Sequence, residues 1–321
     1  MQIAVFAQQQ TMFIQPIVDR LARRGHSVTI YGRQSAAQLA EIMSRVDLAW
    51  FEFCDDAIVT ATTGPKVCPI VCRLHSYEVF ADTPAVVQWA KVDCIVFVAA
   101  HIQEIFEARF GNLVPSSTQR IVIHNGVNLD QFGAPPGKLY GSKKVAYVGY
   151  INFKKNPGLL LQCFEEILVK DPTYTFHIAG MHRDERIRLY IEKYITDNKL
   201  PVVFHGWIPH VSLADWLFDK DFVISTSYLE SFCYGIAEPM ACGVVPLIHR
   251  WVGAEGLYAD DFLFSSARQC AAQVVRFGQD AACLHVQGQR AAAYIQERFD
   301  ANNITTAIES LCARLAHVHK L

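Results

Sequence analysis

Residues 221–249 read DFVISTSYLESFCYGIAEPMACGVVPLIH, and their pattern gives the strongest indication of the fold. An apolar strand comes first, a turn then carries Glu230, and a helix starts near Gly235 with Glu238 in its first turn. Gly243 ends that helix before a second buried strand, VVPLI. A strand, a helix and another buried strand in this order predict a parallel sheet with a crossover helix.

The same alternation extends over the whole chain. Apolar runs such as IAVFA, SVTIYG, VDLAWFEF and CIVFVA alternate with helix-like text before Gly126, and KVAYVGY, TFHIAGM and VVFHGW do so after Lys144. Between these two series, residues 133–142 contain two Pro and three Gly, which is typical of a linker. Asn156 and Pro157 are predicted as the cap and first residue of a helix. The pattern therefore predicts two α/β halves.

Length and charge limit the classes of function. The 321 residues are enough for two domains, and 51% of them are hydrophobic, which is typical of globular chains. The formal net charge is −2, from 29 Lys and Arg against 31 Asp and Glu, so a nucleic-acid binder is not indicated. We expect no signal peptide and no membrane-spanning helix. The ten cysteines are scattered in apolar text, which predicts free buried thiols and a cytoplasmic location.

Two glutamates are the candidate ligand-binding residues of the opening stretch. Ligands of such sheets bind beyond the carboxyl ends of the strands, and a helix N-terminus offers amide groups and a positive dipole end to a diphosphate. Glu238 beside that terminus is predicted to accept hydrogen bonds from two ribose hydroxyls. Glu230 at the strand end is predicted to accept them from hexose hydroxyls. The alternative is two surface glutamates, and the pair by itself does not exclude it.

The block ESFCYGIAEPMACGVVP, which contains both glutamates, resembles the signature of retaining glycosyltransferases of family 4, the glycosyl transferases group 1. The resemblance implies the GT-B fold, an α/β architecture of two Rossmann-like domains that face each other across a deep cleft. Residues 1–134 would form the acceptor-side domain, and residues 135–300 would bind the nucleotide sugar. Residues 301–321 would form a helix that returns toward the first domain.

A second resemblance concerns the phosphate loop. VGYINFKKNP is similar to the family's phosphate loop, with Gly149 at its start and Lys155 where an ammonium group meets the donor diphosphate. Lys154 adds a second positive charge. Tyr150, however, stands where the family usually has arginine, so one expected cation is missing. Lys154 and Arg250 are the candidate replacements.

Three further stretches match the family in order. RLHSYEVF places His75 where the family's histidine faces the donor hexose, although a lone histidine is more often structural. VVFHGWIP resembles the strand and turn near the nucleotide base, which implies backbone contacts at Trp207 and Ile208. The catalytic set is therefore His75, Lys155 and Glu230. The donor-binding set is Gly149, Lys154, Lys155, Trp207, Ile208, Glu230, Ser231, Phe232, Cys233, Tyr234, Gly235, Ile236 and Glu238.

The acceptor side departs from the family. Many members have two glycines after the first strand, whereas this chain reads AQQQTMF. A loop that bears side chains leaves less room near the diphosphate. The polar residues of this loop are predicted to contact the acceptor instead; they are Gln8, Gln9, Gln10 and Thr11.

The resemblance also implies a mechanism. Lys155, Lys154 and the helix N-terminus at residues 234–236 would stabilise the leaving UDP or GDP in place of a divalent cation. We therefore expect no metal and no cofactor. The anomeric configuration would be retained, and the leaving phosphate rather than a protein base would deprotonate the acceptor. Glu230 is not expected to act as a nucleophile.

Three functions stay open at this point. The favoured one is a hexosyltransferase of cell-surface glycan or glycoconjugate synthesis, whose partners are a nucleotide sugar and a glycan acceptor, with peripheral membrane contact allowed. The second is a sugar-nucleotide epimerase or a phosphorylase of the same architecture. The third is a degenerate relative that binds a nucleotide sugar or a partner without catalysis. Tyr150 favours the third, whereas Glu230, Glu238 and Lys155 weigh against it.

Overall fold

The computed structural model describes residues 1–8, 11 and 14–319. Gln9 and Gln10, two of the predicted acceptor-side residues, therefore lie outside the described residues. The chain divides into two compact units, one formed by Met1–Gly126 together with Ala301–Leu321 and the other by Val127–Asp300. Each unit is an α/β layer structure, and each is described by itself.

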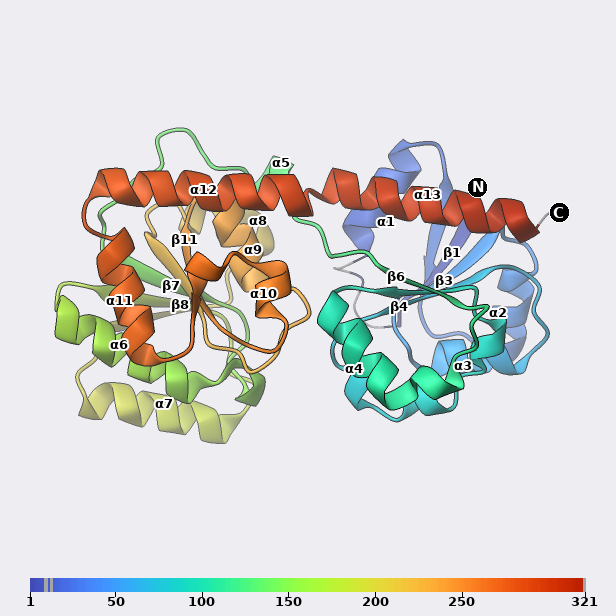
Figure 1. Ribbon diagram of the computed structural model, residues 1–321, viewed down its shortest axis with the longest axis horizontal. Helices are drawn as coiled ribbons and strands as arrows, with labels where there is room; N and C mark the ends of the chain where they lie inside the picture. Colours follow the sequence, from blue (N-terminus) through green and yellow to red (C-terminus); the bar gives the residue numbers. More distant parts are fainter. Residues whose placement is uncertain (9–10, 12–13, 320–321) are drawn as a thin grey trace. The chain divides into compact units, whose positions relative to one another are not determined.

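The first unit is built on a parallel six-stranded sheet in the order β2-β1-β3-β4-β5-β6 (Figure 1). Every residue of β3, β4 and β5 is buried, as expected for strands covered on both faces. The strands are β1 (Gln2–Phe6), β2 (Ser27–Tyr31), β3 (Leu48–Phe51), β4 (Ile70–Leu74), β5 (Cys94–Phe97) and β6 (Gln119–Val122). The helices are α1 (Gln15–Arg23), α2 (Ala36–Met43), α3 (Asp56–Thr63), α4 (Ala100–Phe110) and α13 (Ala301–His319).

Helix α13 belongs to the first unit because it completes that unit's core. Ile308, Leu311 and Leu315 are buried in one cluster with residues of β1, β3 and α1. Polar contacts hold the same helix, since the Glu309 carboxylate lies 2.7 Å from both Arg24 and His26. The sheet would otherwise expose the apolar face that α13 covers.

The second unit repeats the design with a parallel sheet in the order β12-β11-β10-β7-β8-β9. Its strands are β7 (Lys144–Val148), β8 (Thr175–Ala179), β9 (Val202–Gly206), β10 (Phe222–Ser225), β11 (Val245–His249) and the short β12 (Leu263–Phe264). Its helices are α5 (Leu129–Phe132), α6 (Pro157–Lys170), α7 (Glu185–Asp197), α8 (His210–Trp216), α9 (Tyr234–Ala241), α10 (Ala254–Leu257), α11 (Ala267–Phe277) and α12 (Ala281–Phe299). The strands predicted from the apolar runs and the predicted start of α6 at Pro157 are confirmed in these elements.

The predicted linker is part of the second unit. Lys138 donates to the carbonyl of Leu217 at 2.9 Å, and the Asp221 carboxylate accepts from the backbone of Gly141 at 2.9 Å and of Lys143 at 2.6 Å. Pro and Gly signal a break in regular structure but not a free segment. These bonds fasten residues 133–142 to the sheet, and the division between units falls earlier, after Gly126.

Strand order in the second unit marks one position for ligands. The chain runs from β7 outward through β8 to β9, and then from β10 outward through β11 to β12, so β7 and β10 are neighbours at the point where the order reverses. Ligands of open α/β sheets bind at the carboxyl ends of the strands at such a switch point. The loops that leave Val148 and Ser225 lie there.

Two expectations about composition can be compared with the structure. All ten cysteines are free, and nine of them are buried, as the sequence predicts. Among the described residues, no helix is both long and apolar enough to span a bilayer.

Candidate active site

The loop after β7 places two lysines at the switch point. Gly149 has φ 137°, a conformation that side-chain-bearing residues rarely adopt, and an added Cβ there would lie 3.9 Å from Lys155 Cε. A 3₁₀ turn, η5 (Phe153–Lys155), follows, with the Asn152 side chain accepting from the backbone of Lys155 at 3.2 Å. Asn156 then caps α6, as predicted, by accepting from the backbone of Leu159 at 3.3 Å.

The loop after β10 is hydrogen-bonded to the turn η5 (Phe153–Lys155), which we call the lysine turn. Thr226 Oγ1 donates to the carbonyl oxygen of Lys155 at 2.8 Å, and the Tyr228 amide donates to that of Lys154 at 2.9 Å. Ser227 Oγ donates to Glu230 Oε1 at 2.8 Å. The first two bonds join loops that are far apart in sequence, and the third, within the loop after β10, orients the Glu230 carboxylate.

Glu230 is held between the two lysines. Lys155 Nζ lies 2.5 Å from Glu230 Oε1, and Lys154 Nζ lies 2.9 Å from Glu230 Oε2. Burial raises the pKa of Glu230, but the positive charges of Lys155 and Lys154 outweigh burial and hold that pKa at about 2. Burial likewise lowers the pKa of Lys155, but Glu230 outweighs it and the pKa lies above its usual range. Glu230 and Lys155 are therefore both charged at neutral pH, and with Lys154 the cluster holds two ammonium groups against one carboxylate.

Helix α9 begins one residue before the predicted start, at Tyr234. Cys233 precedes it in the left-handed region with φ 67°. Gly235 is needed because a Cβ there would lie 2.2 Å from the carbonyl oxygen of Val148, the last residue of β7. The helix N-terminus therefore approaches the end of β7, and its positive dipole end lies at the switch point. The expectation that Glu238 lies in the first turn is wrong, because it is the fifth helical residue.

Most of the predicted donor-binding block is buried. The side chains of Phe232, Cys233 and Ile236 are at most 8% exposed, so a ligand here would meet their backbone rather than their side chains. The carbonyl of Phe232 accepts from the buried Tyr258 hydroxyl. Burial on this scale explains why the segment between the two glutamates is apolar.

Glu238 has a protein partner that the sequence did not indicate. Its Oε1 lies 2.8 Å from Nε2 of His210, the first residue of α8, and Gln131 Nε2 donates to the His210 carbonyl at 2.8 Å. The hydrogen bond to Glu238 raises the pKa of His210, whereas burial raises the pKa of Glu238. The contact therefore favours the protonated form of His210.

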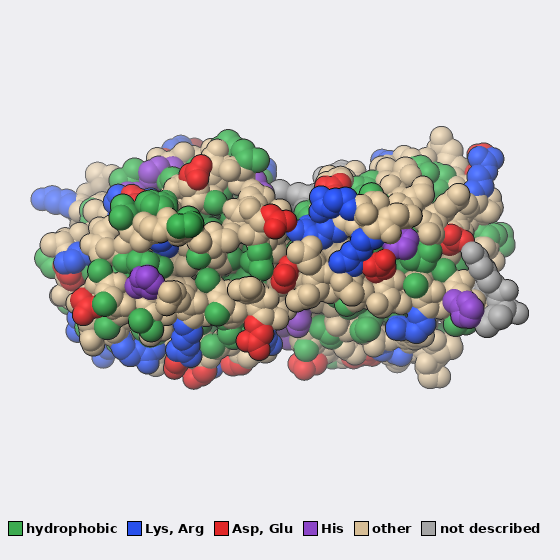
Figure 2. All heavy atoms as spheres, turned by 90° about the horizontal axis from the view of Figure 1, so that it is seen from above, with side chains coloured by type: hydrophobic (Ala, Val, Ile, Leu, Met, Phe, Trp, Pro, Cys, Tyr) green, Lys and Arg blue, Asp and Glu red, His purple; other side chains and the backbone are tan. Residues whose placement is uncertain are grey.

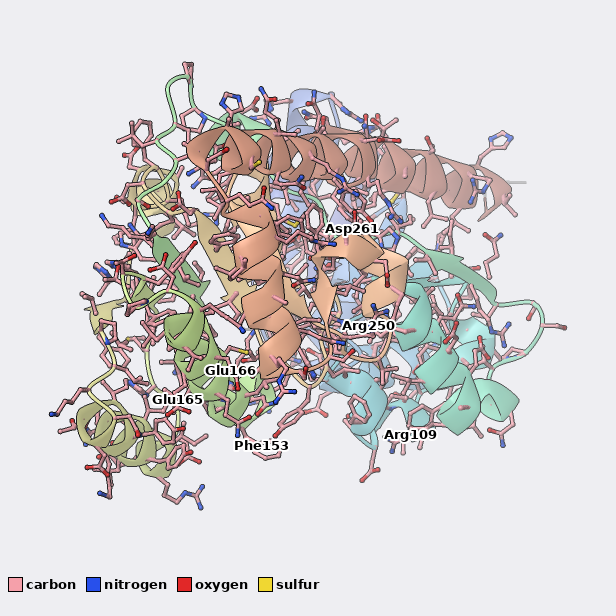
Figure 3. All side chains as sticks on the ribbon, turned by 60° about the vertical axis from the view of Figure 1, so that its left-hand side comes forward. Arg109, Phe153, Glu165, Glu166, Arg250 and Asp261 are labelled. Atoms are coloured by element: carbon pink, nitrogen blue, oxygen red, sulfur yellow. The ribbon has the colours of Figure 1, made fainter. Side chains whose placement is uncertain are left out.

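The two candidate replacements for the missing arginine are both occupied. Lys154 pairs with Glu230, as described above, and Arg250 pairs with Glu255 at 3.0 Å and Asp260 at 2.6 Å. Figure 3 labels Arg250 and Asp261 in the part of the unit around α10, whereas Phe153, in the turn that carries the lysines, lies at its lower edge. Arg250 therefore forms ion pairs within the segment that follows β11.

Trp207, predicted to lie near the nucleotide base, follows β9 and is 50% exposed. Its ring is stacked on that of Tyr150, with 5.7 Å between centroids and 20° between planes. Ile208 is next to it and half-buried. Trp207 is thus brought beside the loop after β7.

In the first unit, His75 follows β4 and is buried in an ionic cluster. Its Nε2 lies 3.1 Å from Glu52 Oε1, and Arg73 donates to the same oxygen at 3.0 Å. Trp50 Nε1 also donates to Glu52, at 2.9 Å. Burial raises the pKa of Glu52, but Arg73 and His75 outweigh burial, so the pKa is lowered and the carboxylate stays charged. This cluster fixes the orientation of the His75 ring.

The remaining acceptor-side residues lie before α1. Gln8 is half-buried, and Thr11 is exposed while its carbonyl accepts from the backbone of Gln15 at 2.7 Å. This bond ties Thr11 to the first residue of α1. Their predicted contact with an acceptor stays a prediction.

Two surface pockets lie away from the cluster formed by Lys154, Lys155 and Glu230. One pocket of about 370 Å³ lies along β2 and α2, and another of about 360 Å³ is lined by Arg250, Asp261 and residues of α11. On the face seen in Figure 2, groups of Lys and Arg lie among Asp and Glu on each unit. Among the described residues, no three His, Cys, Asp or Glu side chains are arranged to hold a metal ion.

Sequence reasoning missed three polar partners at these sites: His210, Glu52 and Arg73. Glu52 directly follows the buried run LAWF, and Arg73 lies inside the buried strand β4. A charge within or at the end of a buried strand needs a partner, so both could have been singled out. His210 carried no such signal, because it is an exposed residue at the start of α8.

Comparison with known families decides the assignment of the second unit. Residues 134–263 match the family model described as glycosyl transferases group 1. These residues form a group 1 glycosyltransferase domain. The matched range contains both the lysine turn and the Glu230–Glu238 block, so the predicted resemblance is confirmed at the level of the family.

A curated relative of this glycosyltransferase domain comes from the plant Arabidopsis thaliana. It is one of the subunits of phosphatidylinositol N-acetylglucosaminyltransferase, and it is 25% identical over 260 residues, which cover 77% of this chain and 53% of that protein. The chain therefore spans about half the length of the curated relative that it matches.

Solved structures share the fold over the full length. Anabaena Alr3699/HepE in complex with UDP has a TM-score of 0.80 at 17% identity, covering 98% of this chain and 100% of the other. Sucrose-phosphate synthase from Thermosynechococcus elongatus has a TM-score of 0.78 at 17% identity, covering 99% and 100%. At such identities the likeness concerns the fold alone, and the predicted α/β fold of the GT-B class is confirmed.

Proposed function

We propose that the chain is a retaining glycosyltransferase that moves a hexose from a nucleoside-diphosphate sugar to an acceptor hydroxyl. The observation that carries the proposal is the cluster of Lys154, Lys155 and Glu230 beside the N-terminus of α9. A net positive charge and a positive dipole end at one switch point suit a diphosphate. The Glu230 carboxylate between the lysines can accept hydrogen bonds from hydroxyls of the sugar that the diphosphate carries.

The chemistry of the residues supports a transfer step in which the leaving diphosphate is stabilised. As the anomeric bond breaks, negative charge grows on the β-phosphate, and preorganised cations lower the energy of that state. Lys155 is already oriented by Glu230 at 2.5 Å, so it needs little rearrangement. Because Glu230 contacts two ammonium groups and one hydroxyl, it is a poor nucleophile and a poor base. We infer that the leaving phosphate accepts the acceptor proton and that the configuration is retained.

The names of related proteins agree with a donor of this kind. HepE has been solved with UDP and with UDP-glucose, and the Arabidopsis relative is named for the transfer of N-acetylglucosamine. We therefore place a UDP-sugar first among donors, with a GDP-sugar second. The ten free thiols support a reducing compartment, and we propose a cytoplasmic location and a role in cell-surface glycan or glycoconjugate synthesis.

A donor panel tests the proposal. Thermal unfolding is measured with UDP-, GDP- and ADP-sugars and with each free nucleoside diphosphate. One nucleotide class is expected to raise Tm by an amount that grows with the logarithm of its concentration relative to Kd. Its sugar donor is expected to be hydrolysed slowly without an acceptor. The anomeric configuration of the product, read by NMR, then reports on retention. A chain that no nucleotide stabilises would be a binding relative of another kind, and the proposal would be wrong.

Glu238→Ala is expected to weaken binding of the nucleoside diphosphate about tenfold, because a ribose contact is lost. The 2′-deoxy analogue makes the test specific: wild type should bind it less tightly than the ribonucleotide, whereas Glu238→Ala should bind both equally in isothermal titration. Glu166→Ala, a half-buried glutamate on α6, is the matched control. Equal affinity of wild type and Glu238→Ala for the ribonucleotide contradicts the ribose assignment.

A further inference from the structure

Three loops at the carboxyl ends of β7, β8 and β9 bring together Tyr150, Arg183 and Trp207. The Arg183 guanidinium lies over the Tyr150 ring, 4.0 Å from its centroid, and the same ring is stacked on Trp207. A guanidinium over an aromatic face is attracted by the ring's negative charge density. The contact therefore gives Arg183, an exposed residue, a defined position.

Backbone pairing holds these loops in register beyond the ends of the strands. The Ile151 amide donates to the carbonyl of Met181 and the Arg183 amide to that of Ile151, both at 2.9 Å. Gly180 permits this approach, since a Cβ there would lie 1.8 Å from the carbonyl oxygen of Gly149. Arg183 and Tyr150 are thus positioned by main-chain bonds as well as by their side chains.

Among the residues that the structure describes, Arg183 differs from the other arginines nearby in having no acidic partner. Arg186 pairs with Asp184 at 2.7 Å, and Arg188 pairs with Glu192 at 2.6 Å. Within the part of the chain that the structure describes, no carboxylate pairs with the Arg183 guanidinium. Its charge is therefore available to a ligand without the loss of an ion pair.

The position of Tyr150 connects this cation to the lysine turn. Tyr150 directly follows Gly149, and a Cβ added to Gly149 would lie 3.9 Å from Lys155 Cε. Lys154 and Lys155 together offer one net positive charge after Glu230 is counted, whereas a diphosphate carries at least two negative charges. Tyr150 occupies the position where the family usually has arginine, and its ring contacts the guanidinium of a different arginine, Arg183.

We propose that Arg183, presented on the face of Tyr150, supplies the second positive charge to the diphosphate of the donor. The inference rests on the proposed function and adds one binding residue to it. The charge that the sequence lacks at position 150 is then provided from the next strand of the sheet. A purely structural role, in which Arg183 only holds Tyr150 against Trp207, is the competing explanation.

Binding of nucleotides that differ by one phosphate separates the two explanations. UDP and UMP, with GDP and GMP in parallel, are titrated into wild type and Arg183→Ala. Arg183→Ala is expected to weaken diphosphate binding about tenfold, and monophosphate binding by clearly less, because the lost contact is to the diphosphate. Arg186→Ala removes an exposed arginine on α7 and should change neither affinity.

A compensating variant makes the inference sharper. Tyr150→Arg in the Arg183→Ala background returns a guanidinium to the same place and should restore diphosphate affinity. Equal losses for mono- and diphosphate in Arg183→Ala, or no loss at all, would overturn the inference and leave the proposed function standing. If wild type binds neither diphosphate, the proposed function itself fails. Circular dichroism confirms that each variant is folded, as expected for an exposed side chain.

Discussion

Replacing Glu230 with glutamine is expected to lower kcat about 100-fold while nucleoside-diphosphate affinity stays the same or improves. The carboxylate orients Lys154 and Lys155 and, in the proposal, holds the hexose, so its loss acts on the transition state. Removal of its negative charge leaves two free ammonium groups, which attract a diphosphate more strongly. Steady-state kinetics and isothermal titration on the same variant measure the two effects separately.

The variant has a stability effect that must be kept apart from catalysis. Lys155 would keep a buried charge without its partner, which is expected to reduce the free energy of unfolding by about 3 kcal/mol. Kinetics are therefore measured well below the Tm of the variant. Glu166→Gln, on α6 and outside the cluster, is the matched control and should retain wild-type kcat. A kcat for Glu230→Gln close to that of wild type would remove Glu230 from the mechanism.

Gly235→Ala is expected to destabilise the protein by about 3 kcal/mol and to abolish nucleotide binding. The new Cβ would lie 2.2 Å from the Val148 carbonyl oxygen, so α9 or β7 must move. The carbonyl belongs to the main chain and the backbone fixes the position of the Cβ, so neither can rotate away as the end of a flexible side chain would. Urea denaturation gives the stability change, and thermal shift with the selected nucleotide gives the binding change.

Gly158→Ala is the matched control for this prediction. Gly158 lies in the first turn of α6, and a Cβ there would come no closer than 4.0 Å to its neighbour, the Asn156 side chain. Alanine favours a helix over glycine, so Gly158→Ala should raise stability by about 0.5 kcal/mol. If Gly235→Ala were as stable as Gly158→Ala and bound nucleotide, the close approach of α9 to β7 would not be required.

Much of the fold could be predicted from local sequence. The buried strands of a parallel sheet are apolar throughout, so runs such as VDLAWFEF and KVAYVGY can be recognised without knowing their neighbours. The cap at Asn156 and the proline after it are local signals as well. Domain limits were less readable, because residues 133–142 look like a linker while side chains such as Lys138 fasten them to the second unit.

The composition of the candidate site was equally readable, but its pairing was not. Lys154, Lys155, Glu230 and Glu238 were all predicted, since each stands in a recognisable motif. That both lysines contact Glu230, 76 and 75 residues away, depends on β7 and β10 being neighbours in the sheet. The hydrogen bond of His210 to Glu238 and the contact of Arg183 with Tyr150 also depend on the fold, because it brings loops that are distant in sequence to one edge of the sheet.

The class of fold, the glycosyltransferase resemblance and the importance of residues 221–249 can thus be read from the sequence, because periodicity, caps and motifs are local properties. Which charges meet depends on the tertiary structure. Strand order brings together the ends of β7, β8 and β10, and hydrogen bonds between their loops set the side chains at contact distance. Glu230 consequently lies between two lysines and the Arg183 guanidinium lies over the Tyr150 ring, since contacts across a sheet are set by topology and not by spacing along the chain.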